Sequence, residues 1–81
     1  MPLDPDQVKV AAREAIADLT KRSLADDQCI VSSGLIDSLS VLKLISALER
    51  KLQIRIPTER VQPEDFDSVE VIQETLERIL P

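Results

Sequence analysis

The sequence predicts an all-α fold, a small antiparallel helical bundle with three main helices, one short helix and a long first loop. Three stretches carry apolar residues at the spacing of an amphipathic helix. An acidic residue that can cap a helix precedes each stretch, and the segments between them contain Pro, Ser, Asp or Gly. With 81 residues, the chain is predicted to form one domain over residues 1–81. Its compact ends favour a stand-alone protein.

The first helix is predicted at about residues 5–21. Asp4 provides the cap, Pro5 suits the first helical position, and Gln7 can complete a capping box. The apolar residues that recur at helical spacing predict the buried stripe: Val8, Ala12, Ala15, Ile16 and Leu19.

Residues 22–37 lack a sustained periodicity and are predicted to form a long loop, of a length that is usually functional or disordered. Ile30, Val31 and Leu35 offer apolar anchors for it. A short strand at residues 29–31 is the competing interpretation. Cys29, the only cysteine, is predicted to be a partly buried, reduced thiol, because the chain contains no His to activate it.

The second helix is predicted at about residues 38–52. Its buried stripe lies within about 100° of a helical wheel and comprises Val41, Leu44, Ile45, Leu48 and Leu52. Leu39 falls nearly opposite this stripe, and Leu42 lies off its edge towards Ser38. An outward Leu39 favours a contact with a partner, although isolated surface Leu residues are also common.

After the second helix, Ile54 and Ile56 are predicted to pack into the core. A short helix is expected at about residues 58–62. The last helix is predicted at about residues 68–80, with Asp67 as its cap, Glu70 completing a capping box and Phe66 as a hydrophobic staple. The inward face of this helix is predicted to consist of Val69, Ile72, Leu76, Ile79 and Leu80.

The start of the second helix is the candidate functional site. Capping by Asp37 would leave the Ser38 hydroxyl beside the positive end of the helix dipole, which favours an attached or bound phosphate. Gly34 gives the preceding loop the backbone freedom to turn into the helix. No general base is visible nearby, so a phosphate acceptor fits Ser38 better than a nucleophilic catalyst does.

The sequence Gly34-Leu35-Ile36-Asp37-Ser38-Leu39 resembles the prosthetic-group site of the acyl and peptidyl carrier proteins. The resemblance implies that Ser38 carries 4′-phosphopantetheine, that Asp37 also supports metal and phosphate during its transfer, and that Leu39 meets partner enzymes. It further implies three kinds of partner: a phosphopantetheinyl transferase, an acyl- or aminoacyl-loading ligase, and the synthase enzymes of a fatty acid, polyketide, nonribosomal peptide or related pathway. The helical order and the long first loop also fit this family.

A second Asp-Ser pair, Asp67-Ser68, repeats the local pattern. Between residues 58 and 80, seven acidic and two basic side chains give a net charge of −5. A phosphodiester on Ser68 would therefore meet several like charges within a Debye length of roughly 8–10 Å. Ser68 is predicted to be an ordinary residue at a helix start.

The second helix departs from the acidic pattern typical of carriers in bacterial fatty acid synthesis. Three basic side chains and one acidic side chain give residues 38–52 a net charge of +2. This charge favours a specialised pathway over central fatty acid synthesis, while an ordinary solvated face remains the alternative. The predicted partner-docking residues are Leu39, Leu42, Lys43, Ser46 and Arg50.

The remaining features narrow the class of function. A net charge of −5 argues against a nucleic-acid partner, no apolar run is long enough for a membrane span, and residues 1–4 lack signal-peptide features. We expect a cytoplasmic monomer that is not an enzyme and holds no metal, because no acid/base pair or ligand cluster is visible. The alternative function is an unmodified helical adaptor that binds a partner protein through the outer face of the second helix.

Overall fold

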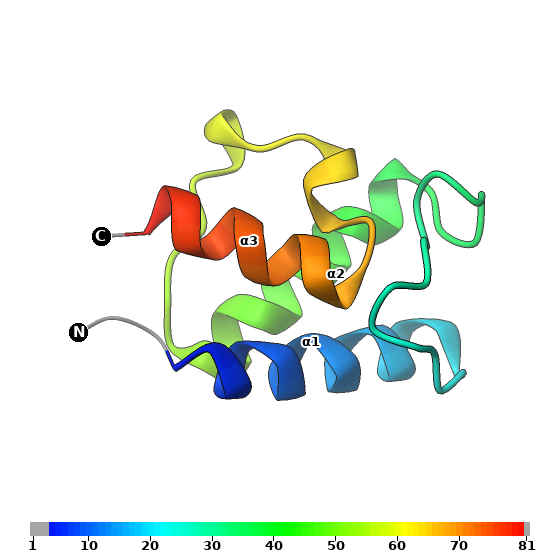
Figure 1. The fold of residues 1–81 in the computed structure, drawn as a ribbon. Coiled ribbons are helices and arrows are strands. Elements are labelled where there is room, and N and C mark those ends of the chain that lie inside the picture. The colour runs from blue at the N-terminus through cyan, green and yellow to red at the C-terminus, as the bar shows by residue number, and fades with distance from the viewer. Residues whose placement is uncertain (1–3, 81) are drawn as a thin grey trace.

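A computed structural model describes residues 4–80. Residues 1–3 and 81 of the predicted domain lie outside the described residues, and with them most of the segment that is predicted to lack signal-peptide features. Residues 4–80 form three α-helices and two 3₁₀ turns, without a strand: α1 (Pro5–Thr20), α2 (Ser38–Leu52), η1 (Thr58–Arg60), η2 (Pro63–Phe66) and α3 (Val69–Ile79). Figure 1 shows α2 and α3 running back against the direction of α1. The predicted all-α antiparallel bundle is confirmed.

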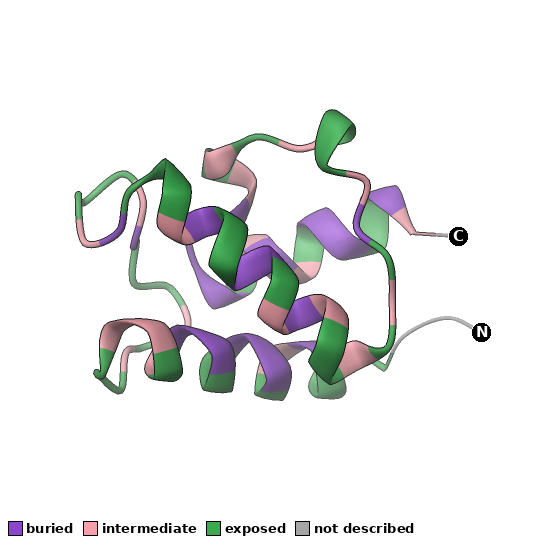
Figure 2. Cartoon of the chain, turned by 180° about the vertical axis from the view of Figure 1, so that it is seen from behind, coloured by how far each residue is buried: buried purple, intermediate pink, exposed green. Residues whose placement is uncertain are grey.

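Helix α1 packs against both other helices, so the core lies where the three inward faces meet. Figure 2 shows these buried faces turned towards one another, with exposed residues on the outside of each helix. The core is aliphatic apart from one aromatic ring, and its largest fully buried side chains are Phe66, Ile30, Leu44, Leu48, Ile72, Leu76 and Val8. Burial of this apolar surface is the main term that stabilises so small a bundle.

Most of the predicted stripe residues are buried, including Val8 in α1 and Leu44 in α2. Leu19, Leu52 and Leu80 are only partly buried, because each lies at or beyond the last turn of its helix. Ala11 and Thr75 are buried as well, although the sequence prediction left them out of the stripes.

The first helix begins as the sequence indicates, because Asp4 Oδ1 accepts a hydrogen bond from the Asp6 backbone N–H at 2.9 Å. Within residues 4–80, the Gln7 side chain makes no hydrogen bond, so the capping box predicted for it is wrong. The helix ends at Thr20, one residue earlier than predicted, because Lys21 adopts a left-handed conformation with a φ of 61°.

The cap predicted for the last helix is wrong. Ser68, not Asp67, is the N-cap: its side chain accepts a hydrogen bond from the Val71 N–H at 3.1 Å, and α3 therefore begins at Val69. The Asp67 carboxylate instead accepts hydrogen bonds from residues 30–32 of the first loop. The helix ends at Ile79, one residue before the predicted end.

The segment between α2 and α3 contains two short turns where the sequence predicted one short helix. The first turn, η1, ends at Arg60 instead of residue 62. The second turn, η2, was not predicted, and it is closed by a capping box between Gln62 and Asp65.

The long first loop contains no strand at residues 29–31, so the competing strand interpretation is wrong. The Ile30 N–H donates to the backbone oxygen of Asp67 at 2.7 Å, in a contact between two loops that forms no strand ladder. Ile30 is fully buried, whereas Cys29 is exposed. The predicted partial burial of Cys29 is therefore wrong, because its neighbour Ile30 takes the inward position.

Among the residues that the structure describes, no helix has both the length and the apolar character that crossing a membrane requires.

Candidate functional site

The candidate site is the start of α2. Asp37 precedes the helix in an extended conformation, and its Oδ1 accepts a hydrogen bond from the Ser40 backbone N–H at 2.8 Å. Ser38 is the first helical residue; it is exposed, and its hydroxyl makes no hydrogen bond within residues 4–80. Its oxygen therefore lies free at the positive end of the helix dipole, where a phosphate is favoured.

The carboxylate of Asp37 is stabilised in its ionised form. Hydrogen bonds from the backbone and hydroxyl of Ser40 lower the pKa of Asp37 most, and the positive charge of Lys43 lowers it further. Because Asp37 holds one of the orphan N–H groups of the first turn, the other N–H groups of that turn remain available to a phosphate beside Ser38.

Gly34 makes the turn that leads into this site. Its φ of 81° lies in the left-handed region, and its N–H donates to the Val31 oxygen at 3.0 Å. An added Cβ would meet no atom within 4 Å. Glycine is therefore favoured here by its backbone conformation and not by a lack of space.

A mostly apolar groove of about 220 Å³ opens beside Ser38. Helix α2 forms one wall, and the segment from η1 to η2 forms the other. The lining residues are Ser38, Leu39, Val41, Leu42, Ile45, Thr58, Val61, Gln62 and Pro63. An apolar surface next to an exposed attachment atom can hold an extended, partly apolar chain against the protein.

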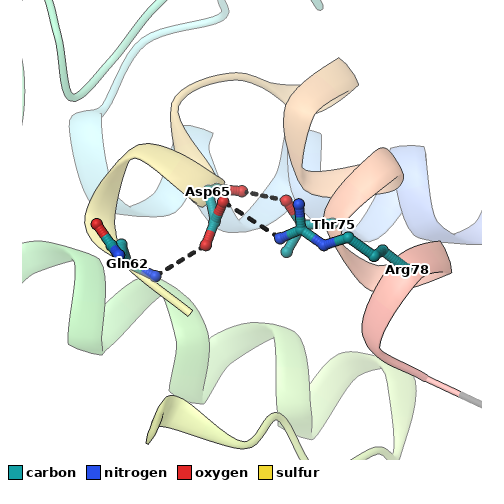
Figure 3. A network of polar contacts seen from close by, with 4 residues as sticks. All are labelled: Gln62, Asp65, Thr75 and Arg78. Carbon is teal, nitrogen blue, oxygen red and sulfur yellow. Dashed lines mark hydrogen bonds and ion pairs between the residues drawn. The ribbon is translucent and has the colours of Figure 1, made fainter. Parts of the chain in front are cut away.

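Asp65 fixes the second wall of the groove to α3 (Figure 3). Its carboxylate accepts from the Gln62 N–H at 2.8 Å and pairs with Arg78 at 3.3 Å, while its backbone oxygen accepts from the Thr75 hydroxyl at 2.8 Å. The buried Thr75 thereby satisfies its hydroxyl. These contacts hold the wall at a set position relative to Ser38.

Ser68, the serine of the second Asp-Ser pair, lies in a very different environment. Only 4% of its surface is exposed, and its hydroxyl oxygen is engaged by the Val71 N–H. A group attached to Ser68 would have to displace both the helix cap and the surrounding core side chains. The structure therefore leaves Ser38 as the accessible member of the two pairs.

The predicted docking residues all lie on the exposed side of α2. Leu39 is 71% exposed and Leu42 is 53% exposed, so two large apolar side chains face solvent beside Ser38. Lys43, Ser46 and Arg50 continue along the same side at helical spacing and are exposed as well.

The basic residues of α2 have different surroundings. Lys51 faces α1, where its ammonium lies 3.9 Å from an Asp18 oxygen and 4.0 Å from a Glu14 oxygen. Within residues 4–80, neither Lys43 nor Arg50 forms an ion pair. Their charges are therefore directed to solvent on the side of α2 that carries Leu39.

Sequence reasoning missed two parts of the site. The first is the groove wall at Thr58, Val61 and Pro63; the pattern Gln62-Pro63-Glu64-Asp65, a capping box with Pro at the first position, could have indicated its second turn. The second is the contact of Asp67 with the loop that leads to Ser38. Nothing local in the sequence indicates that contact, because its partners lie more than thirty residues apart.

Comparison with known proteins identifies the family of the chain. No curated protein and no solved structure matches the chain significantly. A family model described as "Phosphopantetheine attachment site" matches residues 11–79, which include α2, the groove, α3 and most of α1. Members of this family are carrier proteins with a covalent 4′-phosphopantetheine. The chain belongs to the phosphopantetheine attachment-site family and is a carrier domain for that prosthetic group.

Proposed function

We propose that Ser38 is the attachment residue and that the domain carries an acyl or aminoacyl intermediate for a fatty acid, polyketide, nonribosomal peptide or related specialised pathway. One observation carries the choice of residue. Of the two serines that follow Asp at a helix start, Ser38 is exposed with a free hydroxyl, whereas Ser68 is 4% exposed and caps α3.

The residues at the start of α2 fit the proposed attachment. In the transfer, the Ser38 oxygen bonds to the phosphorus of the pantetheine arm of coenzyme A, adenosine bisphosphate leaves, and a base of the transferase takes the serine proton. The attached arm supplies a terminal thiol that holds cargo as a thioester. The N-terminus of α2 stabilises the phosphate charge, and the apolar groove beside Ser38 offers a surface for the arm or its cargo.

Asp37 has a second role in this proposal. The Ser40 backbone N–H donates to Asp37 Oδ1, and Asp37 is exposed beside Ser38 at the start of α2. A carboxylate oxygen there can bind a divalent cation that the transferase brings with coenzyme A, and that cation would offset the repulsion between Asp37 and phosphate. Asp37 would thus support the transfer as well as the helix.

Partner enzymes would dock on the exposed side of α2. Leu39 and Leu42 supply an apolar contact beside Ser38, and Lys43, Ser46 and Arg50 extend it with a polar, basic stripe. A basic stripe is matched by an acidic patch on the partner, because complementary charge steers association and disfavours other partners. We therefore place this carrier in a specialised pathway with acidic docking partners.

The chemistry on the cargo belongs to the partners in this proposal. A phosphopantetheinyl transferase modifies the domain, an acyl- or aminoacyl-loading ligase charges it, and synthase enzymes use the cargo. The domain itself works as a cytoplasmic monomer without a catalytic residue. Membership of the attachment-site family favours this carrier over the unmodified adaptor.

The intact mass of the protein tests the attachment residue. Incubation with coenzyme A and a broad-specificity phosphopantetheinyl transferase should add one phosphopantetheine group to the wild type and to Ser68→Ala. Ser38→Ala should gain nothing. A gain retained in Ser38→Ala would place the arm on another residue, and no gain in the wild type beside a competent control carrier would refute the carrier function.

Charge reversal tests the docking surface. Lys43→Glu and Arg50→Glu should slow the loading of the domain by its cognate ligase, and the effect should shrink as salt rises. Arg22→Glu makes the same change in net charge outside α2 and serves as the control. Equal slowing by Arg22→Glu would show an effect of net charge and not of a docking stripe.

A further inference from the structure

Asp67 holds the loop that leads to Ser38. We call residues 29–36 the site loop. Asp67 Oδ1 accepts from three consecutive backbone N–H groups of this loop: Ile30 at 3.1 Å, Val31 at 2.7 Å and Ser32 at 2.9 Å. Its Oδ2 accepts from the Ser32 hydroxyl at 2.8 Å. One carboxylate therefore binds three successive residues that lie at least 35 positions earlier in the chain.

The hydrogen bonds of Asp67 to the site loop, which we call the anchor, are linked to the candidate site through the loop backbone. The Ile30 N–H also donates to the Asp67 backbone oxygen at 2.7 Å, and the Ile30 oxygen accepts from the Ile36 N–H at 2.9 Å. Ile30 and Ile36 are both buried. Because Ile36 directly precedes Asp37, the contact with Asp67 fixes the point from which the chain enters the α2 cap.

The contact favours the ionised form of the Asp67 carboxyl group. Burial would raise the pKa of Asp67, but hydrogen bonds from Ser32, from Val31 and from the thiol of Cys29 outweigh it and hold the pKa below its usual range. All the loop groups donate, so an ionised carboxylate satisfies each of them at once.

The loop contact is not a by-product of helix capping. Ser68 caps α3, and within residues 4–80 the hydrogen bonds of the Asp67 side chain all go to the first loop. Asp67 lies at the start of α3 but does not cap it. Its carboxylate instead stabilises the backbone of the loop before Ser38.

We propose that Asp67 is a positioning residue for Ser38, which holds the site loop so that the Asp37 cap and the Ser38 hydroxyl keep the arrangement that the phosphopantetheinyl transferase binds. This inference rests on the proposed attachment at Ser38. Without the anchor, the loop samples other conformations, and only a fraction of the molecules presents the arrangement that the enzyme binds. The apparent KM then rises by the inverse of that fraction while kcat is unchanged.

Steady-state kinetics of the modification test the inference, with the carrier as the varied substrate and coenzyme A saturating. Asp67→Ala should raise the KM of the carrier about ten-fold if the competent fraction falls to about one tenth, with kcat unchanged. Asp67→Asn should give a smaller rise, because its amide oxygen can still accept from the three loop N–H groups.

The matched control is Ser68→Ala. It destabilises the same end of α3 by removing the cap, yet it leaves the loop contacts in place. Its KM should stay within about two-fold of the wild type, because the competent fraction is unchanged. Amide hydrogen exchange gives a direct reading: Val31, Ser32 and Ile36 should exchange faster in Asp67→Ala and not in Ser68→Ala.

A wild-type KM in Asp67→Ala, or an equal rise in Ser68→Ala, would overturn the inference. If Asp67→Ala does not fold, the KM and the amide exchange of Asp67→Asn test the inference instead. An unchanged KM and an unchanged exchange pattern in Asp67→Asn would then overturn the inference. A wild type that gains no phosphopantetheine would refute the proposed function instead, so the two failures are distinguishable.

Discussion

The two Asp-Ser pairs have the same local sequence pattern and opposite structures. In the first pair, Asp37 caps α2 and leaves Ser38 exposed in the first turn. In the second pair, Ser68 caps α3 and is buried, and Asp67 turns to the site loop. The helix start is shifted by one residue between the two pairs, and that shift separates an accessible serine from an inaccessible one.

The difference shows that a cap depends on what else competes for the carboxylate. Asp37 has one backbone donor in the first turn of its helix, whereas Asp67 has three loop N–H groups and a hydroxyl. A hydrogen bond to a charged group contributes about 1.5–3 kcal/mol, against about 1 kcal/mol for a typical helix cap. The Asp67 carboxylate therefore binds the loop, and the adjacent Ser68 caps α3 instead.

The largest effect on stability is expected from Asp67→Ala. Removing the carboxylate leaves loop N–H groups, including that of the fully buried Ile30, with fewer acceptors. The free energy of unfolding should fall by about 3 kcal/mol, as measured by urea denaturation followed by circular dichroism. Asp27→Ala, a change at an exposed loop acid, is the control and should stay within about 0.5 kcal/mol. Equal losses in both variants would mean that the loop contacts contribute little.

The two caps should be of similar strength. Asp37→Ala and Ser68→Ala each remove one hydrogen bond to a first-turn N–H, at 2.8 and 3.1 Å. Each should lower the free energy of unfolding by about 1 kcal/mol. The same denaturation experiment checks this, and a loss in Ser68→Ala as large as that in Asp67→Ala would show that the two residues form one inseparable unit.

The pH dependence of stability should separate Asp67 from its neutral isostere. Its loop hydrogen bonds lower the pKa of Asp67 in the folded protein, against the effect of burial. Around pH 4 the unfolded chain therefore binds more protons than the folded one, and stability rises with pH there. The stabilisation is complete above about pH 5 and is lost as pH falls through the lowered pKa.

Denaturation of the wild type and Asp67→Asn at several pH values measures this contribution. The difference in unfolding free energy between them should be largest above about pH 5 and shrink towards acid. A difference that is constant with pH would contradict the assigned hydrogen bonding.

The smallest effect on stability is expected from Ser38→Ala. The Ser38 hydroxyl is exposed and unpaired within residues 4–80, and Ala is a good helix former. The free energy of unfolding should change by less than about 0.5 kcal/mol, although this is the variant that should lose modification. A strongly destabilised Ser38→Ala would mean that the hydroxyl has a structural role, and its modification result would then need a comparison at matched stability.

The elements with strong local signals were predictable from the sequence. An acidic cap followed by a wide apolar stripe places the second helix at residues 38–52, and α2 spans Ser38–Leu52. The apolar spacing likewise indicates the inward faces of the other two helices. These features depend on residues within a few turns of one another, so a single sequence contains the necessary information.

Features that depend on distant contacts were not predictable in this way. The sequence pattern around Asp67 fits a cap as well as the pattern around Asp37, and only its contact with the site loop decides otherwise. The exposure of Cys29 follows from the inward turn of Ile30, which is set by the same contact. At the candidate site, the sequence indicates Ser38, whereas the groove wall near Val61 depends on how η2 packs on α3.

The exposed position of Cys29 has a practical consequence for following the carrier through its cycle. The chain has a single cysteine, and it is accessible. A colorimetric thiol titration of the native protein should therefore find one thiol per chain before modification, two once the arm is attached, and one again when cargo blocks the arm. Hydroxylamine cleaves thioesters, so it should restore the second thiol only in the loaded form. Thiol counts before and after hydroxylamine together distinguish the three states, and Cys29→Ser would provide a background of zero.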